Sequence, residues 1–264
     1  MKTKFNAKKI ALGVALTVGI AGPVLATHSW NGYHWKRTGG ELTILVGDNV
    51  SGVWDGHLDR AIADWNKSTV IQSPKVAGTT NPKNCRAVAG TIQVCNGKYG
   101  QTGWLGIASI SLSGGHITQG TTKLNDTYFS MPQYNSDSWR QLVTCQEIGH
   151  DYGLGHQDED FNTDNTNSCM DYTSNPAGNE SPDAHDYQQL LDIYNHTEAA
   201  SVVIGGPGRS GMDVGDTPAE WGRAIHFTKD GRPDVFERVD GPGQRTITHV
   251  FWALGEGPRG NHAE

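Results

Sequence analysis

Residues 146–156 read Gln-Glu-Ile-Gly-His-Asp-Tyr-Gly-Leu-Gly-His and carry the most informative pattern in the chain. On a helix, Gln146 and His150 lie one turn apart on one face, with Glu147 beside them. Gly153 can take a left-handed conformation without steric cost and end that helix. The chain can then fold back and bring His156 to the same face. Imidazole nitrogen suits zinc, and three protein ligands plus a water form a catalytic zinc site.

This stretch resembles the metzincin signature His-Glu-x-x-His-x-x-Gly-x-x-His, which is followed downstream by a methionine turn. The corresponding turn here is Cys169-Met170-Asp171-Tyr172, and its Met-x-Tyr order resembles the astacin and serralysin form. The chain departs from the signature at one position, because Gln146 stands where the family has its first His. An amide oxygen is neutral and should be a weaker ligand than imidazole. The motif therefore indicates a fold, and activity is a separate question.

The resemblance implies an α+β, metzincin-like fold: a twisted mixed β-sheet with long helices and a small C-terminal β-element. The active-site helix is expected to end at Gly153, and Met170 is expected to support the site from below. One catalytic zinc ion is expected, with His150, His156 and Gln146 as its ligands.

The activity implied by the resemblance is that of a secreted zinc-dependent endopeptidase acting on polypeptide. Zinc would lower the pKa of its water and polarise the scissile carbonyl. Glu147 would act as general base, and Tyr172 would stabilise the oxyanion. In matrixin-like and astacin-like enzymes the edge strand of the sheet pairs with extended substrate. By resemblance, residues 104–112 are the candidate for that edge.

Two other function classes compete with the endopeptidase. A catalytically impaired binding protein on a metzincin fold is the alternative, because Gln146 replaces a ligand. A carbohydrate- or wall-binding module is a third class, and it depends on Trp30 and Trp252 being exposed. The metal content of the purified protein separates the first two classes.

The first 26 residues have the pattern of a secretory signal peptide rather than of a folded element. A positively charged start precedes the apolar run 10–20, and Val24-Leu25-Ala26 offers small residues for cleavage. The apolar run is short for a membrane span. We expect a catalytic domain over 27–204, a Gly- and Pro-rich linker over 205–222 and a β-strand extension over 223–264.

The charge balance argues against some partners. The whole chain has 21 Lys and Arg against 28 Asp and Glu, a formal net charge of −7. The signal peptide contains four of the Lys and no acidic residue, so 17 basic residues and a charge of −11 remain after its removal. An acidic surface disfavours nucleic acid and anionic membrane as partners. We expect a secreted monomer.

Four cysteines in an exported chain indicate disulfides, and their number alone allows three connectivities. Cys85 and Cys95 flank a short segment that can form a hairpin or loop closed by its own bridge. Cys145 precedes Gln146, and Cys169 precedes the methionine of the turn. In a metzincin the turn lies beneath the active-site helix, so the resemblance implies Cys145–Cys169 beside Cys85–Cys95. A four-cysteine zinc site lacks its usual Cys-x-x-Cys pairs here.

Periodicity predicts the remaining elements. Residues 27–40 are expected to pack their aromatic side chains on the domain, and the three C-terminal strands are expected to need a packing partner. The expected helices are 53–67, 138–149 and one that starts at Ser181-Pro182; the expected strands are 41–50, 70–76, 104–112, 117–124, 224–228, 235–239 and 246–253.

Two further features have a metal-binding and an ordinary interpretation. The acidic run 158–164 resembles a calcium loop, but Thr163 and Cys169 stand where an EF-hand needs Gly and Glu. A hydrated loop is the interpretation we prefer, with Ca²⁺ as the alternative. His116 has the chemistry of a spare metal ligand, although a loop histidine is usually only solvated.

Overall fold

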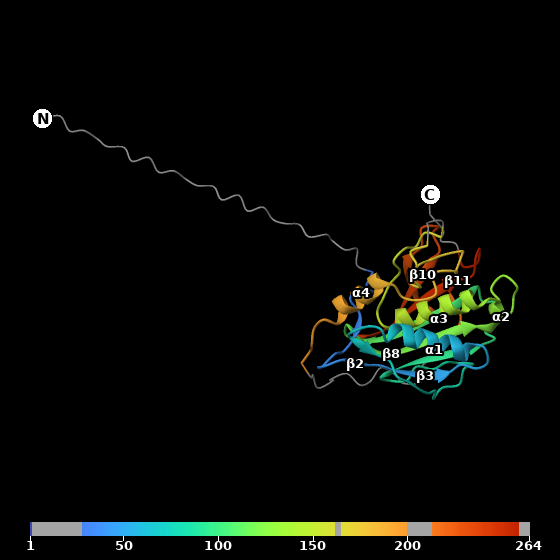
Figure 1. The fold of residues 1–264 in the computed structure, drawn as a ribbon, viewed down its shortest axis with the longest axis horizontal. Coiled ribbons are helices and arrows are strands. Elements are labelled where there is room, and N and C mark those ends of the chain that lie inside the picture. The colour runs from blue at the N-terminus through green and yellow to red at the C-terminus, as the bar shows by residue number, and fades with distance from the viewer. Residues whose placement is uncertain (2–27, 162–164, 200–212, 259–264) are drawn as a thin grey trace.

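A mixed β-sheet forms the frame of the molecule in the computed structural model, which describes residues 1, 28–161, 165–199 and 213–258 (Figure 1). In spatial order its strands are β5 (Lys75–Ala77), β3 (Leu45–Asn49), β6 (Thr91–Gly97), β8 (His116–Asn125), β7 (Trp104–Ser113), β11 (Gln244–Trp252), β10 (Pro233–Gly241) and β9 (Arg223–Phe227), with β1 (His34–Trp35) on β8. In this order, neighbouring strands from β5 to β8 are parallel, and neighbouring strands from β8 to β9 are antiparallel. A second, two-stranded sheet pairs β2 (Leu42–Thr43) with β4 (Ile71–Gln72).

Two helices, α1 (Trp54–Trp65) and α3 (Asp137–Asp151), lie side by side over one face of the main sheet (Figure 1). The buried stripe of α1 has the helical spacing expected from the sequence, and it includes Leu58 and Ile62. The other helices are α2 (Asp126–Phe129), α4 (Ala184–Tyr194) and α5 (Pro218–Trp221). The N-cap of α4 is Asp183, in a capping box, and not the expected Ser181. The α+β class with a mixed sheet is therefore confirmed.

A second hydrophobic cluster, separate from the main core, includes residues of the stretch that we expected to be a linker. Within the described part of 205–222, Val214 and Trp221 are buried against sheet residues, and Trp104 donates from Nε1 to the Asp216 carbonyl at 2.8 Å. Trp252 is also buried there. A carbohydrate-binding function required this tryptophan to be exposed, so this position does not support that function. The rest of the expected linker, 205–212, lies outside the described residues.

The C-terminal strands extend the main sheet. β11 pairs antiparallel with β7 along its whole length, from Gln244 opposite Ser113 to Trp252 opposite Trp104. The expectation that residues 104–112 form the edge strand is therefore wrong, since β7 lies between β8 and β11. The physical reason is that residues 104–112 are all buried, so both faces of this strand are covered. A continuous buried run is typical of an interior strand.

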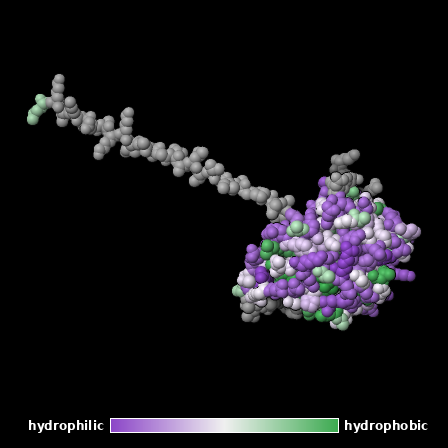
Figure 2. All heavy atoms as spheres, viewed as in Figure 1, coloured by the Kyte–Doolittle hydropathy of each residue, from purple (hydrophilic) through white to green (hydrophobic). Residues whose placement is uncertain are grey.

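Both expected disulfides are present, Cys85–Cys95 and Cys145–Cys169. The N-terminal aromatics pack as expected: Trp35 is buried and donates from Nε1 to the Asp151 carbonyl at 2.8 Å. The face seen in Figure 2 is largely hydrophilic, with scattered apolar groups. No helix within the described ranges has the length and hydrophobicity that a membrane crossing requires. Residues 2–26 of the expected signal peptide and residues 162–164 of the acidic run lie outside those ranges.

Candidate metal centre

Helix α3 and the turn after it place the two motif histidines. Ser136 caps the helix by accepting from the Trp139 backbone N–H at 3.3 Å. At the other end Gly153 has φ +93°, and its N–H donates to the His150 carbonyl at 2.9 Å. The next N–H, of Leu154, donates to the Gly149 carbonyl, which completes a Schellman motif. The helix therefore ends where the sequence predicted, and the chain returns toward its own last turn.

The methionine turn lies against the same helix. A side chain at Gly149 would place its Cβ 2.5 Å from Met170 Sδ and 2.7 Å from Trp65, so only glycine allows this packing. Met170 is fully buried, and the Cys145–Cys169 disulfide joins the helix to the residue before it. Met170 therefore supports α3 as packing.

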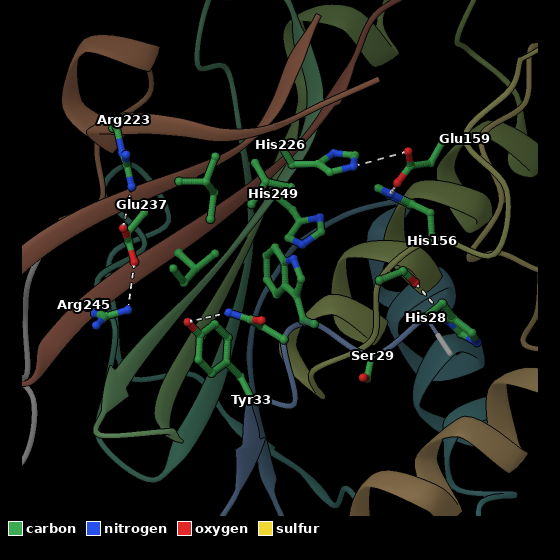
Figure 3. Close-up of a pocket in the computed structure, with 16 residues that line it drawn as sticks. His28, Ser29, Tyr33, His156, Glu159, Arg223, His226, Glu237, Arg245 and His249 are labelled. Carbon is green, nitrogen blue, oxygen red and sulfur yellow. Dashed lines mark hydrogen bonds and ion pairs between the residues drawn. The ribbon is translucent and has the colours of Figure 1, made fainter. Parts of the chain in front are cut away.

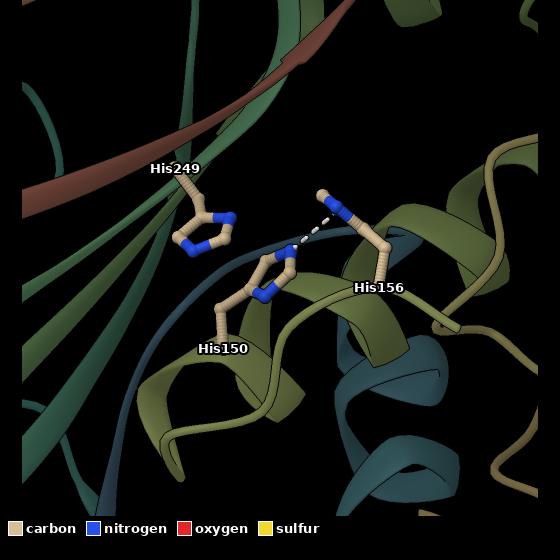
Figure 4. Close-up of side chains that lie close together, drawn as sticks. All are labelled: His150, His156 and His249. Atoms are coloured by element: carbon tan, nitrogen blue, oxygen red, sulfur yellow. Dashed lines mark hydrogen bonds between the residues drawn. The ribbon is translucent and has the colours of Figure 1, made fainter. Parts of the chain in front are cut away.

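Three imidazoles converge beside the end of α3 (Figure 4). His150 Nε2 lies 3.1 Å from His156 Nε2. His249 of β11 joins them, and one ring nitrogen from each of the three lies within 4.8 Å of the others. His150 and His249 are buried, and the His156 side chain is only 3% exposed. The structure therefore brings together the two predicted histidines and a third that the sequence analysis did not select.

Hydrogen bonds and burial define the chemical state of these rings. His150 Nδ1 lies 2.8 Å from the Leu154 carbonyl, so Nδ1 carries the proton and Nε2 carries a lone pair. Burial lowers the pKa of His150 well below its usual value, and the neighbouring His156 adds to this. Burial also lowers the pKa of His249, with His150 as the next cause. Neutral imidazoles with free lone pairs are the form that binds a metal.

Glu147 is fully buried one residue after Gln146. Neither of its carboxylate oxygens has a hydrogen-bond partner among the described residues. A Cβ on Gly106 of β7 would lie 2.9 Å from Glu147 Oε1, so the carboxyl packs against the sheet. Burial raises the pKa of the Glu147 carboxyl well above its usual value, and the Asp151 carboxyl adds to the effect.

Gln146 is held by the methionine turn. Its Nε2 donates to the carbonyls of Cys169 at 2.8 Å and Asp171 at 3.2 Å. Because the amide nitrogen satisfies both carbonyls, Oε1 is left buried and without a partner within the described chain. In the structure, Gln146 therefore links α3 to the methionine turn.

The Tyr172 hydroxyl is already hydrogen-bonded to a residue of strand β10. Its ring lies 4.0 Å from the His156 ring, centroid to centroid, and its hydroxyl donates to Asp234 Oδ2 at 2.9 Å. Burial raises the pKa of Tyr172 well above its usual value, and Asp234 adds to the rise. The other Asp234 oxygen lies 2.8 Å from His226 Nδ1, and the pKa of His226 is raised by that hydrogen bond. The hydroxyl is thus engaged with β10 rather than free to bind an oxyanion.

A cleft of about 630 Å³ opens beside the histidines (Figure 3). Its walls are the N-terminal segment, the loop after α3 and strands β9 to β11, and its lining includes His156, His249 and Glu159. Trp30 also lines it and makes ring contacts with both His150 and His249. The Trp30 backbone N–H donates to the Gly153 carbonyl at 2.8 Å. The N-terminal segment therefore covers the histidine group from the cleft side.

The donor set fits zinc. Both ring nitrogens of His249 and both oxygens of Glu147 are buried with no hydrogen-bond partner in the described chain. Buried polar atoms are normally satisfied, so such a group points to a missing ligand. Three imidazoles match a known catalytic zinc set. His150 also donates its other ring N–H to a carbonyl, as metal-bound histidines do. These three histidines would hold the ion.

His249 had one signal in the sequence. In the strand expected over 246–253 it stands between Ile247 and Phe251, on the face that alternation places inward. A histidine on an apolar strand face suggests a buried partner. The pattern could not identify α3 as that partner, because the pairing of β11 with β7 is a long-range contact.

No family model and no curated protein matches the sequence. Among solved structures, two of myroilysin align with 62% and 64% of this chain and 90% and 99% of theirs, each at 14% identity, with TM-scores of 0.34 and 0.37. High choriolytic enzyme 1, a hatching enzyme zinc-protease from the medaka fish Oryzias latipes, aligns at 17% identity over 61% of this chain and 94% of its own, with a TM-score of 0.34. At such low scores these likenesses establish neither relationship nor function.

Proposed function

We propose that the chain is a secreted zinc-dependent endopeptidase of metzincin type, with His150, His156 and His249 as the metal ligands and Glu147 as the general base. The observation that carries the proposal is the convergence of three imidazoles at the end of a helix that also presents a buried, unpartnered carboxyl. A zinc ion held there would supply a Lewis acid and lower the pKa of water.

The chain's own residues supply the rest of the chemistry. The Glu147 carboxyl would take a proton from the attacking water and return it to the leaving amine. Its pKa is raised mainly by burial, and a nearby positive charge would lower it again. Tyr172 would help only after its hydroxyl leaves Asp234, so we assign it a positioning role on His156.

Substrate would enter through the cleft rather than along β7, because β11 already pairs with that strand. Ion pairs cross one end of the cleft, where Glu237 contacts Arg245 at 3.1 Å and Arg223 at 3.5 Å. A peptide has backbone carbonyls and charged side chains, which arginine and glutamate side chains can bind. Trp30 would have to turn away for the scissile bond to approach His249.

We also propose that the protein is exported from the cell. Both disulfides join cysteines of the expected mature part, and disulfides persist mainly in oxidising compartments. The signal-peptide pattern of residues 1–26 supports the same localisation.

A metal-binding protein without catalytic activity is the second candidate. The covered edge of β7 and the complete burial of Glu147 favour it. It shares the three histidine ligands with the enzyme, so metal content does not separate the two candidates, contrary to the expectation from the sequence, and catalysis must be measured.

The test is cleavage of an unstructured protein by the zinc-loaded protein, with a chelator control. Wild type should cleave, and Glu147→Gln should keep its zinc while losing at least ~10²-fold in rate, as expected for loss of a general base. Glu41→Gln, at an exposed glutamate outside the cleft lining, should cleave like wild type. A zinc-loaded but inert wild type would overturn the enzyme and leave the binding protein.

A further inference from the structure

A second group of histidines lies where the N-terminal strand meets the segment after α4. His34 of β1 and His116 at the start of β8 are register partners, and His196 and Glu198 follow α4. The centroid of the His34 ring lies 5.1 Å from that of His116 and 5.0 Å from that of His196. No residue is shared with the group of His150, His156 and His249. The mechanism proposed above does not use this second group.

The Glu198 carboxylate lies at the centre of the group. Its Oε1 is 2.6 Å from His116 Nε2, 3.5 Å from His34 Nε2 and 4.0 Å from His196 Nε2. One donor atom each from His34, His196 and Glu198 lies within 4.8 Å of the other two. The second oxygen, Oε2, is buried and has no hydrogen-bond partner in the described chain.

The hydrogen bonds of His34 leave one nitrogen free to bind a ligand. His34 Nδ1 lies 2.7 Å from the Gly32 carbonyl, so in the neutral ring Nδ1 carries the proton. The lone pair of Nε2 then faces the Glu198 carboxylate, and Nε2 is buried without a hydrogen-bond partner among the described residues. Two electron-rich atoms face each other at 3.5 Å, which a cation between them would explain. A carbonyl bound to the other ring nitrogen is also the usual outer partner of a metal-bound histidine.

The backbone around the group is fixed. The Glu198 N–H donates to the Arg37 carbonyl at 2.8 Å. The Tyr194 hydroxyl accepts from the Trp35 N–H at 3.2 Å and donates to the Tyr152 carbonyl at 2.7 Å. These bonds hold the end of α4 against β1, so the side chains are brought together before any ligand binds.

We propose that His34, His196 and Glu198 form a second zinc site, in which His116 orients the Glu198 carboxylate. Two imidazoles and one carboxylate are a donor set that zinc accepts, with a further position left for water. The ion would join the N-terminal segment to the end of α4. Because that segment also carries Trp30, the site would help to hold Trp30 over the first histidine group.

The test is the number of zinc ions per chain, measured by native mass spectrometry on protein titrated with zinc. Wild type should bind about two zinc ions. His196→Asn should bind one fewer, and this change should not impair folding because the His196 side chain is 45% exposed. Glu198→Gln should also lose one. His57→Asn is the matched control. The His57 ring has a carboxylate 3.8 Å away, but among the described residues its aromatic neighbour is Trp54 and not a second imidazole.

The two sites can be told apart. His249→Ala should lose the other zinc ion, and the double variant His196→Asn with His249→Ala should bind none. Zinc should also raise the melting temperature of His249→Ala and not of the double variant. If His196→Asn and Glu198→Gln bind as many ions as wild type, the second site is wrong. If wild type binds a single ion that His249→Ala removes, the second site is wrong while the proposed function stands.

Discussion

At the scale of single residues, His249 provides the third imidazole that the motif would place at position 146. The signature places an imidazole at position 146, but the glutamine there donates to two carbonyls of the methionine turn. His249 supplies a third imidazole from β11. In the proposed metal site, the imidazole that the helix lacks at position 146 would be supplied by strand β11.

Gln146→Leu should separate structure from metal binding. The change leaves the buried carbonyls of Cys169 and Asp171 without their donor, so the free energy of unfolding should fall by about 1–3 kcal/mol. The zinc affinity should change little, because three imidazoles remain. Urea denaturation of the metal-free protein and zinc titration measure the two effects.

Gln141→Leu provides the control on the same helix. Gln141 is equally buried, but within the described chain its side chain makes a single hydrogen-bond contact, between Oε1 and His57 Nδ1 at 3.1 Å. The free energy of unfolding should fall by less in the Gln141→Leu variant than in the Gln146→Leu variant. A Gln146→Leu protein of unchanged stability that no longer binds zinc would show that the amide is a ligand.

His28 should make the protein sensitive to acid. Burial lowers the pKa of His28 from 6.5 to about 4, so the unfolded chain takes up this proton first as the pH falls. Its contribution to stability is therefore present above about pH 6.5 and is lost toward pH 4, by about 1.4 kcal/mol per pKa unit. Asp186, whose pKa burial raises to about 6, acts in the opposite direction because the folded chain takes up its proton first.

His28→Asn should flatten this pH dependence, because asparagine does not titrate and can still donate to the Gly155 carbonyl. Wild type should lose more unfolding free energy than the variant between about pH 7 and about pH 5, by about 2 kcal/mol at most. Urea denaturation at the two pH values measures the difference. Parallel losses in the two proteins would contradict the assignment to His28.

At the scale of elements, local patterns predicted α1, α3 and the Gly153 turn because each depends on neighbours in sequence. The spacing of apolar residues and the glycine that ends α3 are local signals. The N-cap of α4 was missed by two residues, since Ser181 and Asp183 are both good caps and only the capping box with Asp186 distinguishes them. The position of β7 inside the sheet was missed because strand order is a long-range property.

The Cys145–Cys169 disulfide should matter for metal binding as well as stability. It closes a sequence separation of 24 residues and joins α3 to the methionine turn, so replacing both cysteines with alanine should cost about 3 kcal/mol. The zinc affinity should also fall, because Met170 packs under the helix that carries His150.

The Cys85–Cys95 pair is the matched control for that change. Its separation is 10 residues, so its removal should cost somewhat less stability and leave the zinc affinity unchanged. Thermal unfolding and zinc titration of both double variants give the comparison. Equal zinc affinities in the two variants would show that the bridge does not position the site.

At the scale of the whole molecule, the site depends on contacts between distant parts of the chain. The pairing of β11 with β7 brings His249 to α3, and the N-terminal segment places Trp30 over both. The motif predicted His150, His156 and their turn, because these are set by one helix and its end. The third imidazole and the covered edge of β7 could not be predicted, because they follow from the order of strands in the sheet.

The zinc affinity of the first histidine group, measured in parallel for wild type, His249→Ala and Gln146→Leu, decides between the two sets of ligands. His196→Asn should be present in all three proteins so that the second group does not contribute. With His150, His156 and His249 as ligands, His249→Ala should lose the zinc ion and Gln146→Leu should keep it. Retention of zinc by His249→Ala together with its loss from Gln146→Leu would contradict the assignment and restore Gln146 as the third ligand.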